Sequence, residues 1–159
     1  MTDRPDMPEI DRIDRAILRI LAADGRISTT VLADRVGLSK TPVAARIRRL
    51  EAAGVITGYA AHLSARKLGL GHVAFVEVRL SDTREAALLA FNAAVRKLPE
   101  VEECYMIAAS FDYLMKVRTR DITEYRRVLG ETISALPHVA STSTYVSMES
   151  VKEPGISQI

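Results

Sequence analysis

The chain of 159 residues has no tryptophan, a single cysteine and only 5% aromatic residues. One cysteine, Cys104, cannot form an internal disulfide, which excludes a disulfide-stabilised scaffold and suits a reducing cytosol. No stretch approaches the roughly 18 apolar residues that a membrane helix needs, and the polar first residues exclude a signal peptide. Hydrophobic residues make up 48% and charged residues 26%. We therefore expect a cytoplasmic globular protein with an aliphatic core and no membrane partner.

Positive charge gathers in one part of a nearly neutral chain, whose net charge is +2. Between residues 34 and 51 the only acids are Asp34 and Glu51. The basic residues of this stretch are Arg35, Lys40, Arg46, Arg48 and Arg49. A local basic cluster of this kind is typical of a phosphate-binding surface.

The first sixty residues predict three short helices that glycine-containing turns separate. The first follows Asp11, the second follows Ser28, and the third runs from about Ser39 to Gly54. Apolar residues at helical spacing are expected to face inward. They are Ile13, Ile17, Ile20, Leu21, Val31, Leu32, Val36, Val43, Ile47 and Leu50. Residues 55–63 predict a strand or small wing with a turn at Thr57-Gly58.

The second half alternates strand and helix patterns. We predict strands over residues 72–80, 101–109, 113–119 and 139–148, and helices over residues 84–98 and 121–135. The order βαββαβ is the ferredoxin-like unit, whose sheet carries helices on one face only. Both alternating sets of side chains of the first strand are largely apolar. Because the helices cover only one face of the sheet, we expect a second subunit to cover the other face.

These patterns predict an α+β chain with two domains. A winged helix-turn-helix DNA-binding domain is expected over residues 10–63 and a hinge over residues 64–71. A ferredoxin-like domain that also mediates dimerisation is expected over residues 72–153, and the family resemblance described below implies that it binds an effector. Flexible tails are expected over residues 1–9 and 154–159.

The second and third helices, joined by Gly37-Leu38-Ser39, have the spacing of a helix-turn-helix, whose second helix enters the major groove of double-stranded DNA. Its outward face combines small residues with arginines, so the backbone can approach the bases while guanidinium groups reach guanine edges or phosphates. The candidate DNA-binding residues are Ser39, Lys40, Thr41, Pro42, Ala45, Arg46, Arg48 and Arg49. A basic face can also be merely solvated, but the three-helix pattern with its glycine turn favours DNA binding.

The sequence resembles the Lrp/AsnC family of transcription factors over residues 11–152. The matching runs are residues 11–18, 24–28, 36–39, 46–51, 54–59, 68–71, 111–117, 121, 125–126 and 144–146. The resemblance implies a winged helix-turn-helix followed by a ferredoxin-like sensing domain, in dimers and often larger assemblies such as octamers. It also implies an amino-acid effector, bound between subunits near the turn between the second and third strands. Residues 111–119 and 136–145 look most like the branch that activates proline catabolism.

In that turn Ala109-Ser110 stand where many members have Gly-Asp, which narrows the pocket or changes the effector that fits. Asp112 can accept the ammonium of an amino acid, and backbone N–H groups with nearby hydroxyls can hold its carboxylate. The candidate effector-binding residues are Met106, Ala109, Ser110, Phe111, Asp112, Tyr113, Thr142 and Thr144, the two threonines coming from the neighbouring chain. Asp112 is equally well explained as a turn-forming residue.

The pattern of an enzyme site is not evident, and we predict no catalytic residue, metal or cofactor. His62, His72 and His138 are far apart and make no metal-ligand spacing with Cys104. Two alternatives stay open. One is an enzyme similar to the sirohaem decarboxylases, which share this architecture. The other is a sensing module that acts only on other proteins, against which a salt-dependent DNA affinity would count.

Overall fold

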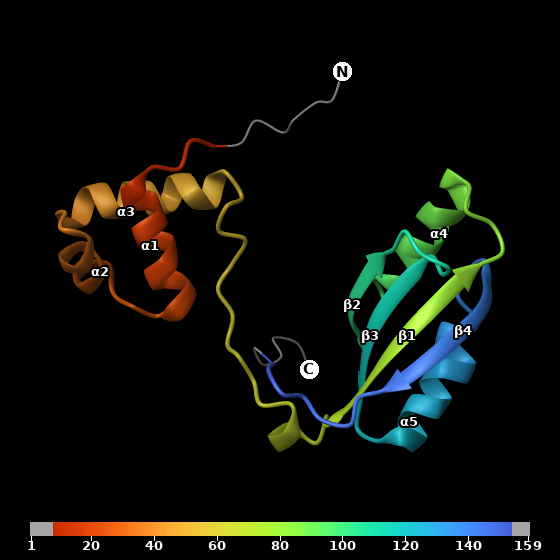
Figure 1. Ribbon diagram of the computed structural model, residues 1–159. Coiled ribbons are helices and arrows are strands. Elements are labelled where there is room, and N and C mark those ends of the chain that lie inside the picture. The colour runs from red at the N-terminus through yellow and green to blue at the C-terminus, as the bar shows by residue number, and fades with distance from the viewer. Residues whose placement is uncertain (1–7, 154–159) are drawn as a thin grey trace. The chain divides into compact units, whose positions relative to one another are not determined.

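The computed structural model describes residues 8–153, which form two compact units divided between Ala61 and His62 (Figure 1). The predicted tails, residues 1–9 and 154–159, lie outside the described residues except for residues 8 and 9. Within the described part of the chain, none of the helices is long and apolar enough to cross a membrane.

The first unit consists of the three predicted helices, α1 (Arg12–Ala23), α2 (Thr29–Val36) and α3 (Lys40–Ala52). Local sequence signals begin and end them. The Asp11 side chain accepts from the backbone N–H of Asp14, and the Asp14 side chain accepts in return from that of Asp11. The Ser28 hydroxyl caps α2, and Gly37 ends it with a left-handed φ of 70°. Side-chain caps of this type satisfy the free N–H groups of a first turn.

The core of the first unit is built from aliphatic side chains of all three helices. Its fully buried members are Ile17, Leu32, Ala33, Val43 and Leu50, and Ile47 packs against them. The predicted inward position of Val31 is wrong, because this side chain is 45% exposed. The short helix α2 turns Leu32 and Ala33 inward, and Val31 lies about 100° around the helix from Leu32.

The segment predicted as a strand or small wing, residues 55–63, contains no strand over residues 53–62, and Leu63 makes an isolated β-bridge. Instead Tyr59 reaches back to α3, where its hydroxyl donates to Glu51 at 3.0 Å. Its ring lies so close to Gly25 that a Cβ there would approach it to 3.3 Å. A strand needs a hydrogen-bonded neighbour, and the elements of this unit are helices.

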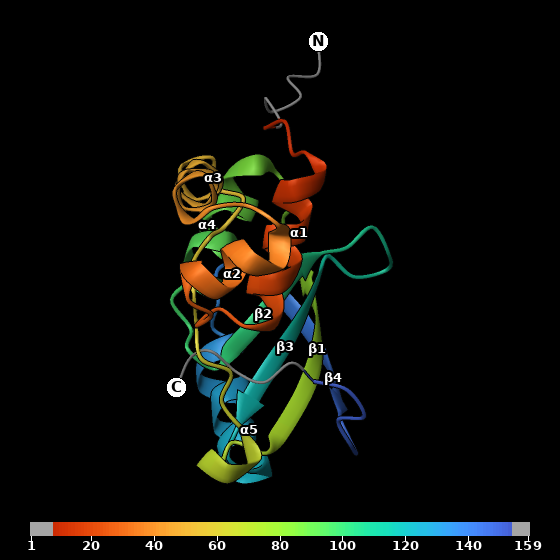
Figure 2. The same ribbon diagram turned by 90° about the vertical axis from the view of Figure 1, so that its left-hand side faces the viewer.

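The second unit confirms the predicted βαββαβ order. Its elements are β1 (His72–Leu80), α4 (Glu85–Val95), β2 (Val101–Met106), β3 (Tyr113–Thr119), α5 (Ile122–Arg127) and β4 (Val139–Val146). A 3-10 helix, Arg66–Leu68, precedes β1, and α5 continues as a π-helical segment over Val128–Ile133. The strands pair antiparallel in the order β2-β3-β1-β4, and both helices lie on one side of the sheet (Figures 1 and 2).

The two faces of this sheet differ in character. Alternate residues of β1 and β3, including Val76, Val78 and Met115, are buried beneath Phe91 of α4 and Tyr125 of α5. We call the other side the open face. Its side chains, assigned from the strand register, are Val73, Phe75, Glu77, Arg79, Glu103, Tyr105, Leu114, Lys116, Arg118, Ser141, Ser143 and Tyr145. The open face is therefore a mixture of apolar and charged residues rather than the largely apolar surface expected from β1.

Candidate DNA-binding and effector sites

The helix α3 presents an exposed surface near its N-terminus. Ser39, Lys40, Thr41, Pro42, Ala45 and Arg48 are all exposed. Val43 and Leu50 on the opposite side are buried against α1 and α2, which confirms the predicted anchoring face. The Ser39 hydroxyl makes no capping bond, so it stays available beside the N–H groups of the first turn. Such groups, with the positive end of the helix dipole, suit a phosphate.

Two of the predicted DNA-binding arginines turn toward α1 instead. Arg46 donates to Asp11 at 2.6 Å and to Asp14 at 2.8 Å. Arg49, which is predicted to lie on the outward face of this helix, pairs with the other oxygen of Asp14. Asp14 is completely buried, and its carboxylate lies 32 and 35 residues away in the sequence from these two arginines. A wheel drawn for α3 alone cannot show such an acceptor on another helix.

The protonation states follow from these contacts. Burial opposes the charge of Asp14, but hydrogen bonds from Arg46 and Arg49 outweigh it and lower the pKa of Asp14 to about 2. The backbone N–H of Asp14 and the Arg46 guanidinium lower the pKa of Asp11. Both carboxylates are therefore charged at neutral pH and balance the two arginines.

In the second unit, the predicted effector turn between β2 and β3 is organised by Asp112. The Asp112 carboxylate accepts from the Leu80 N–H at 2.7 Å, and the Asp112 N–H donates to the Val78 carbonyl at 2.9 Å. These bonds lie where the register of β1 and β4 shifts, between Arg79 and Leu80. Asp112 thus ties the turn to the end of β1, as expected of a turn-forming residue, and its second carboxylate oxygen stays without a hydrogen bond to the described residues.

Sequence reasoning missed a cation at this turn. The Arg79 guanidinium donates to the Ser110 carbonyl. The sequence feature that could have revealed Arg79 is its position near the end of β1, because the antiparallel pairing of β1 with β3 brings that end beside the turn. The turn therefore holds the Asp112 carboxylate and a contact from the Arg79 guanidinium, and its residues Ala109 and Ser110 are exposed.

The remaining predicted effector residues are spread over the sheet. Tyr113 is buried against Phe91, with ring centroids 4.4 Å apart, so its ring belongs to the helix-side core rather than to the surface of the turn. Thr142 and Tyr113 pair with Val78 from opposite sides, two strand spacings or about 10 Å apart. Met106 is exposed, Phe111 is half-buried, and the Thr144 hydroxyl lies 2.6 Å from that of Tyr125. One chain therefore does not bring the two threonines to the turn.

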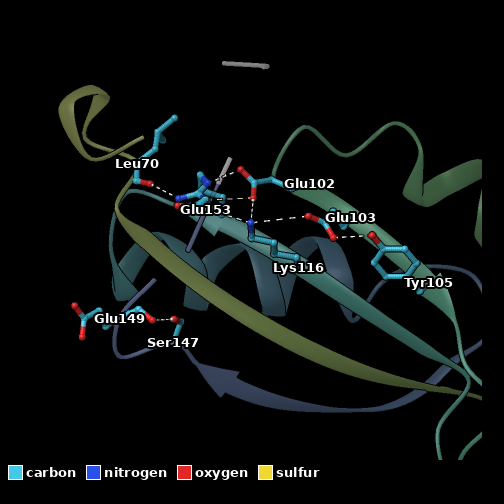
Figure 3. Close-up of polar contacts among 9 residues, drawn as sticks. Leu70, Glu102, Glu103, Tyr105, Lys116, Ser147, Glu149 and Glu153 are labelled. Carbon is cyan, nitrogen blue, oxygen red and sulfur yellow. Dashed lines mark hydrogen bonds and ion pairs between the residues drawn. The ribbon is translucent and has the colours of Figure 1, made fainter. Parts of the chain in front are cut away.

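A buried ion cluster on the open face was also missed (Figure 3). Arg118, with only 5% of its side chain exposed, pairs with Glu102 and Glu153 and donates to the Leu70 carbonyl at 2.9 Å. Lys116 lies 3.0 Å from both carboxylates. Burial opposes the charge of Arg118, but Glu102 and Glu153 outweigh it and raise the pKa of Arg118. The one sequence signal was two cations at alternate positions of an apolar strand.

In comparisons with known proteins, each of the two units matches a protein family. Residues 10–57 match the winged helix-turn-helix DNA-binding family, and residues 73–156 match the Lrp/AsnC ligand binding domain. The chain is 66% identical over 144 residues to the proline dehydrogenase transcriptional activator of Rhodobacter capsulatus, covering 91% of this chain and 94% of that protein. It is 48% identical over 155 residues to the leucine-responsive regulatory protein of Salmonella typhimurium, covering 96% and 94%.

A solved structure gives the same result. A transcriptional regulator from Neisseria meningitidis in complex with L-Met matches with a TM-score of 0.85 and 31% identity, covering 92% of this chain and 94% of that one. The predicted fold class, a winged helix-turn-helix followed by an α+β sensing domain, is confirmed. The matched relatives are transcriptional regulators and not enzymes, which removes the decarboxylase alternative. The chain belongs to the Lrp/AsnC family of transcriptional regulators, with a winged helix-turn-helix DNA-binding domain and a ligand-binding domain.

Proposed function

We propose that this regulator controls a gene for proline breakdown and that L-proline is its effector. The observation that carries the proposal is the 66% identity, over nearly the whole chain, to a proline dehydrogenase transcriptional activator. The 48% identity to a leucine-responsive regulator is lower over a similar length. Because a DNA-binding regulator works where the DNA is, we place it in the cytoplasm.

The effector site is the turn between β2 and β3. One oxygen of Asp112 is bonded to the Leu80 N–H, and the other is available for the ammonium of an amino acid. Arg79, which donates to the Ser110 carbonyl, supplies a positive charge for its carboxylate. Charge-assisted hydrogen bonds at both ends would orient the ligand, and the side chain of Ala109 would limit the pocket to a small apolar group such as the proline ring. Thr142 and Thr144 would join this site only from a second subunit.

The DNA-binding surface is the exposed part of α3, from Ser39 to Arg48, and the protein acts at least as a dimer through the open face. Phe75, Tyr105 and Tyr145 are 38%, 54% and 55% exposed on that face. Apolar side chains gathered on one face of a sheet are typical of a protein–protein interface.

Two measurements test this function. Duplexes selected from a random library by the full-length protein are titrated with and without L-proline, and the proposal expects proline to change their affinity. A thermal-shift screen of the twenty amino acids is run alongside, because a ligand at about a hundredfold excess over its Kd stabilises by about 2.7 kcal/mol. Stabilisation by leucine or methionine, with no response to proline, would overturn the assignment of the effector and leave DNA binding intact.

A further inference from the structure

Four charged side chains join the start of α1 to the middle of α3, and we call them the α1–α3 cluster: Asp11, Asp14, Arg46 and Arg49. Every carboxylate oxygen in it is engaged. Asp14 accepts from Arg46 with one oxygen, and from Arg49 and the Asp11 N–H with the other. Asp11 accepts from the Asp14 N–H with one oxygen and from Arg46 with the other. The cluster therefore has two negative and two positive charges and a net charge of zero.

Because the Asp14 carboxylate is buried, it is unfavourable for the two arginines to leave it and contact DNA instead. The Asp14 side chain is 0% exposed and that of Arg46 only 27% exposed. If Arg46 moved to a phosphate, it would leave a buried carboxylate with one partner fewer, and an incompletely paired buried charge is strongly destabilising. Arg49 is 52% exposed but bonds the same carboxylate.

Lys40 and Arg48 contrast with the cluster on the same helix. Both side chains are exposed, and the described part of the chain offers neither of them an ion pair. Neither cation would have to break an ion pair within the protein in order to contact DNA. Each can therefore neutralise a phosphate and release its counterion, whereas the charges of Arg46 and Arg49 are already balanced by Asp11 and Asp14.

We propose that Asp14 is a positioning residue for DNA recognition, which pins α3 to α1 through Arg46 and Arg49 and withdraws their charges from the DNA contact. Lys40 and Arg48 are then the cations of α3 that touch phosphates or bases. This inference rests on the proposed function, in which α3 is the helix that contacts DNA, and it removes Arg46 and Arg49 from the predicted set of contacts.

The salt dependence of DNA binding tests the inference, because each phosphate contact adds about 0.9 to the slope of log affinity against log salt. The full-length protein is titrated with its selected duplex over a range of salt. Arg48→Gln is expected to flatten the slope by about 0.9. Asp14→Asn keeps an acceptor oxygen but leaves one positive charge unbalanced, so it is expected to steepen the slope by about as much. A merely structural role for Asp14 would weaken binding without steepening the slope.

A charge-balanced double variant, Asp14→Asn with Arg46→Gln, is the matched control and is expected to keep the wild-type slope. If it flattens the slope as Arg48→Gln does, Arg46 contacts phosphate in the complex and the inference is overturned. If Asp14→Asn fails to fold by circular dichroism, Asp11→Asn carries the same expectation, because Asp11 is 47% exposed and Asn is also a good N-cap. If Arg48→Gln changes neither slope nor affinity, the assignment of α3 as the contacting helix fails instead.

Discussion

Replacing Asp112 by Asn and by Ala separates the two roles of this side chain. In the folded protein it accepts the Leu80 N–H at 2.7 Å, and in the proposed site its free oxygen accepts the effector ammonium. Asn keeps an acceptor oxygen for Leu80 but loses the negative charge. Ala loses both, so the two variants share the binding defect and differ in the structural one.

The structure gives the expected magnitudes. With Ala, the half-buried N–H of Leu80 loses its partner, which costs about 1–3 kcal/mol of stability. In a domain of about 60–100 residues, each kcal/mol lowers Tm by about 4–8 °C. Asn should lower the stability by less than about 1 kcal/mol. Both variants lose a charge-assisted contact worth about 1.5–3 kcal/mol, which raises the Kd for L-proline by about 10- to 150-fold.

Calorimetric titration with L-proline and thermal unfolding measure these two effects on the same samples, and a duplex titration checks that DNA binding is retained. Wild-type proline affinity in the Asn variant would show that Asp112 only forms the turn and that the pocket lies elsewhere. A wild-type Tm in the Ala variant would refute the structural part of the reasoning.

Three further predictions concern acid, thiol chemistry and assembly. Because the pKa of Asp14 is lowered from its ordinary 3.8 to about 2 in the folded state, its stabilisation is complete above about pH 4 and is lost as the pH falls toward 2. Urea titrations should show up to about 2 kcal/mol less stability at acid pH, and a loss of the same size in Asp14→Asn would refute the assignment. Burial raises the pKa of Cys104 to about 11, so iodoacetamide at neutral pH should modify it far more slowly than it modifies glutathione; an equal rate would contradict its burial. The fragment 62–159 should have the mass of a dimer or larger in light scattering, and a monomeric mass would count against the open face as an interface.

The helices and strands follow from local sequence signals. Asp11 and Ser28 cap α1 and α2 because their side chains satisfy N–H groups only three residues away. The alternating pattern of β1 and β3 likewise predicted both strands with the bounds that the structure has, His72–Leu80 and Tyr113–Thr119. The local pattern was less informative at residues 55–62, where the structure has no strand, because a strand depends on a neighbouring strand for its hydrogen bonds.

The sites depend on contacts between distant parts of the chain. The sequence by itself determined that α3 has a basic surface, that a turn with an aspartate joins β2 to β3, and that the second sheet face is not covered by helices. Only the tertiary structure decided that Arg46 and Arg49 serve a buried carboxylate more than thirty residues away, and that Arg118 is buried beside Leu70 and Glu153. The physical reason is that a charged side chain binds whichever opposite charge folding brings within about 3 Å, and hydrophobic periodicity does not encode that partner.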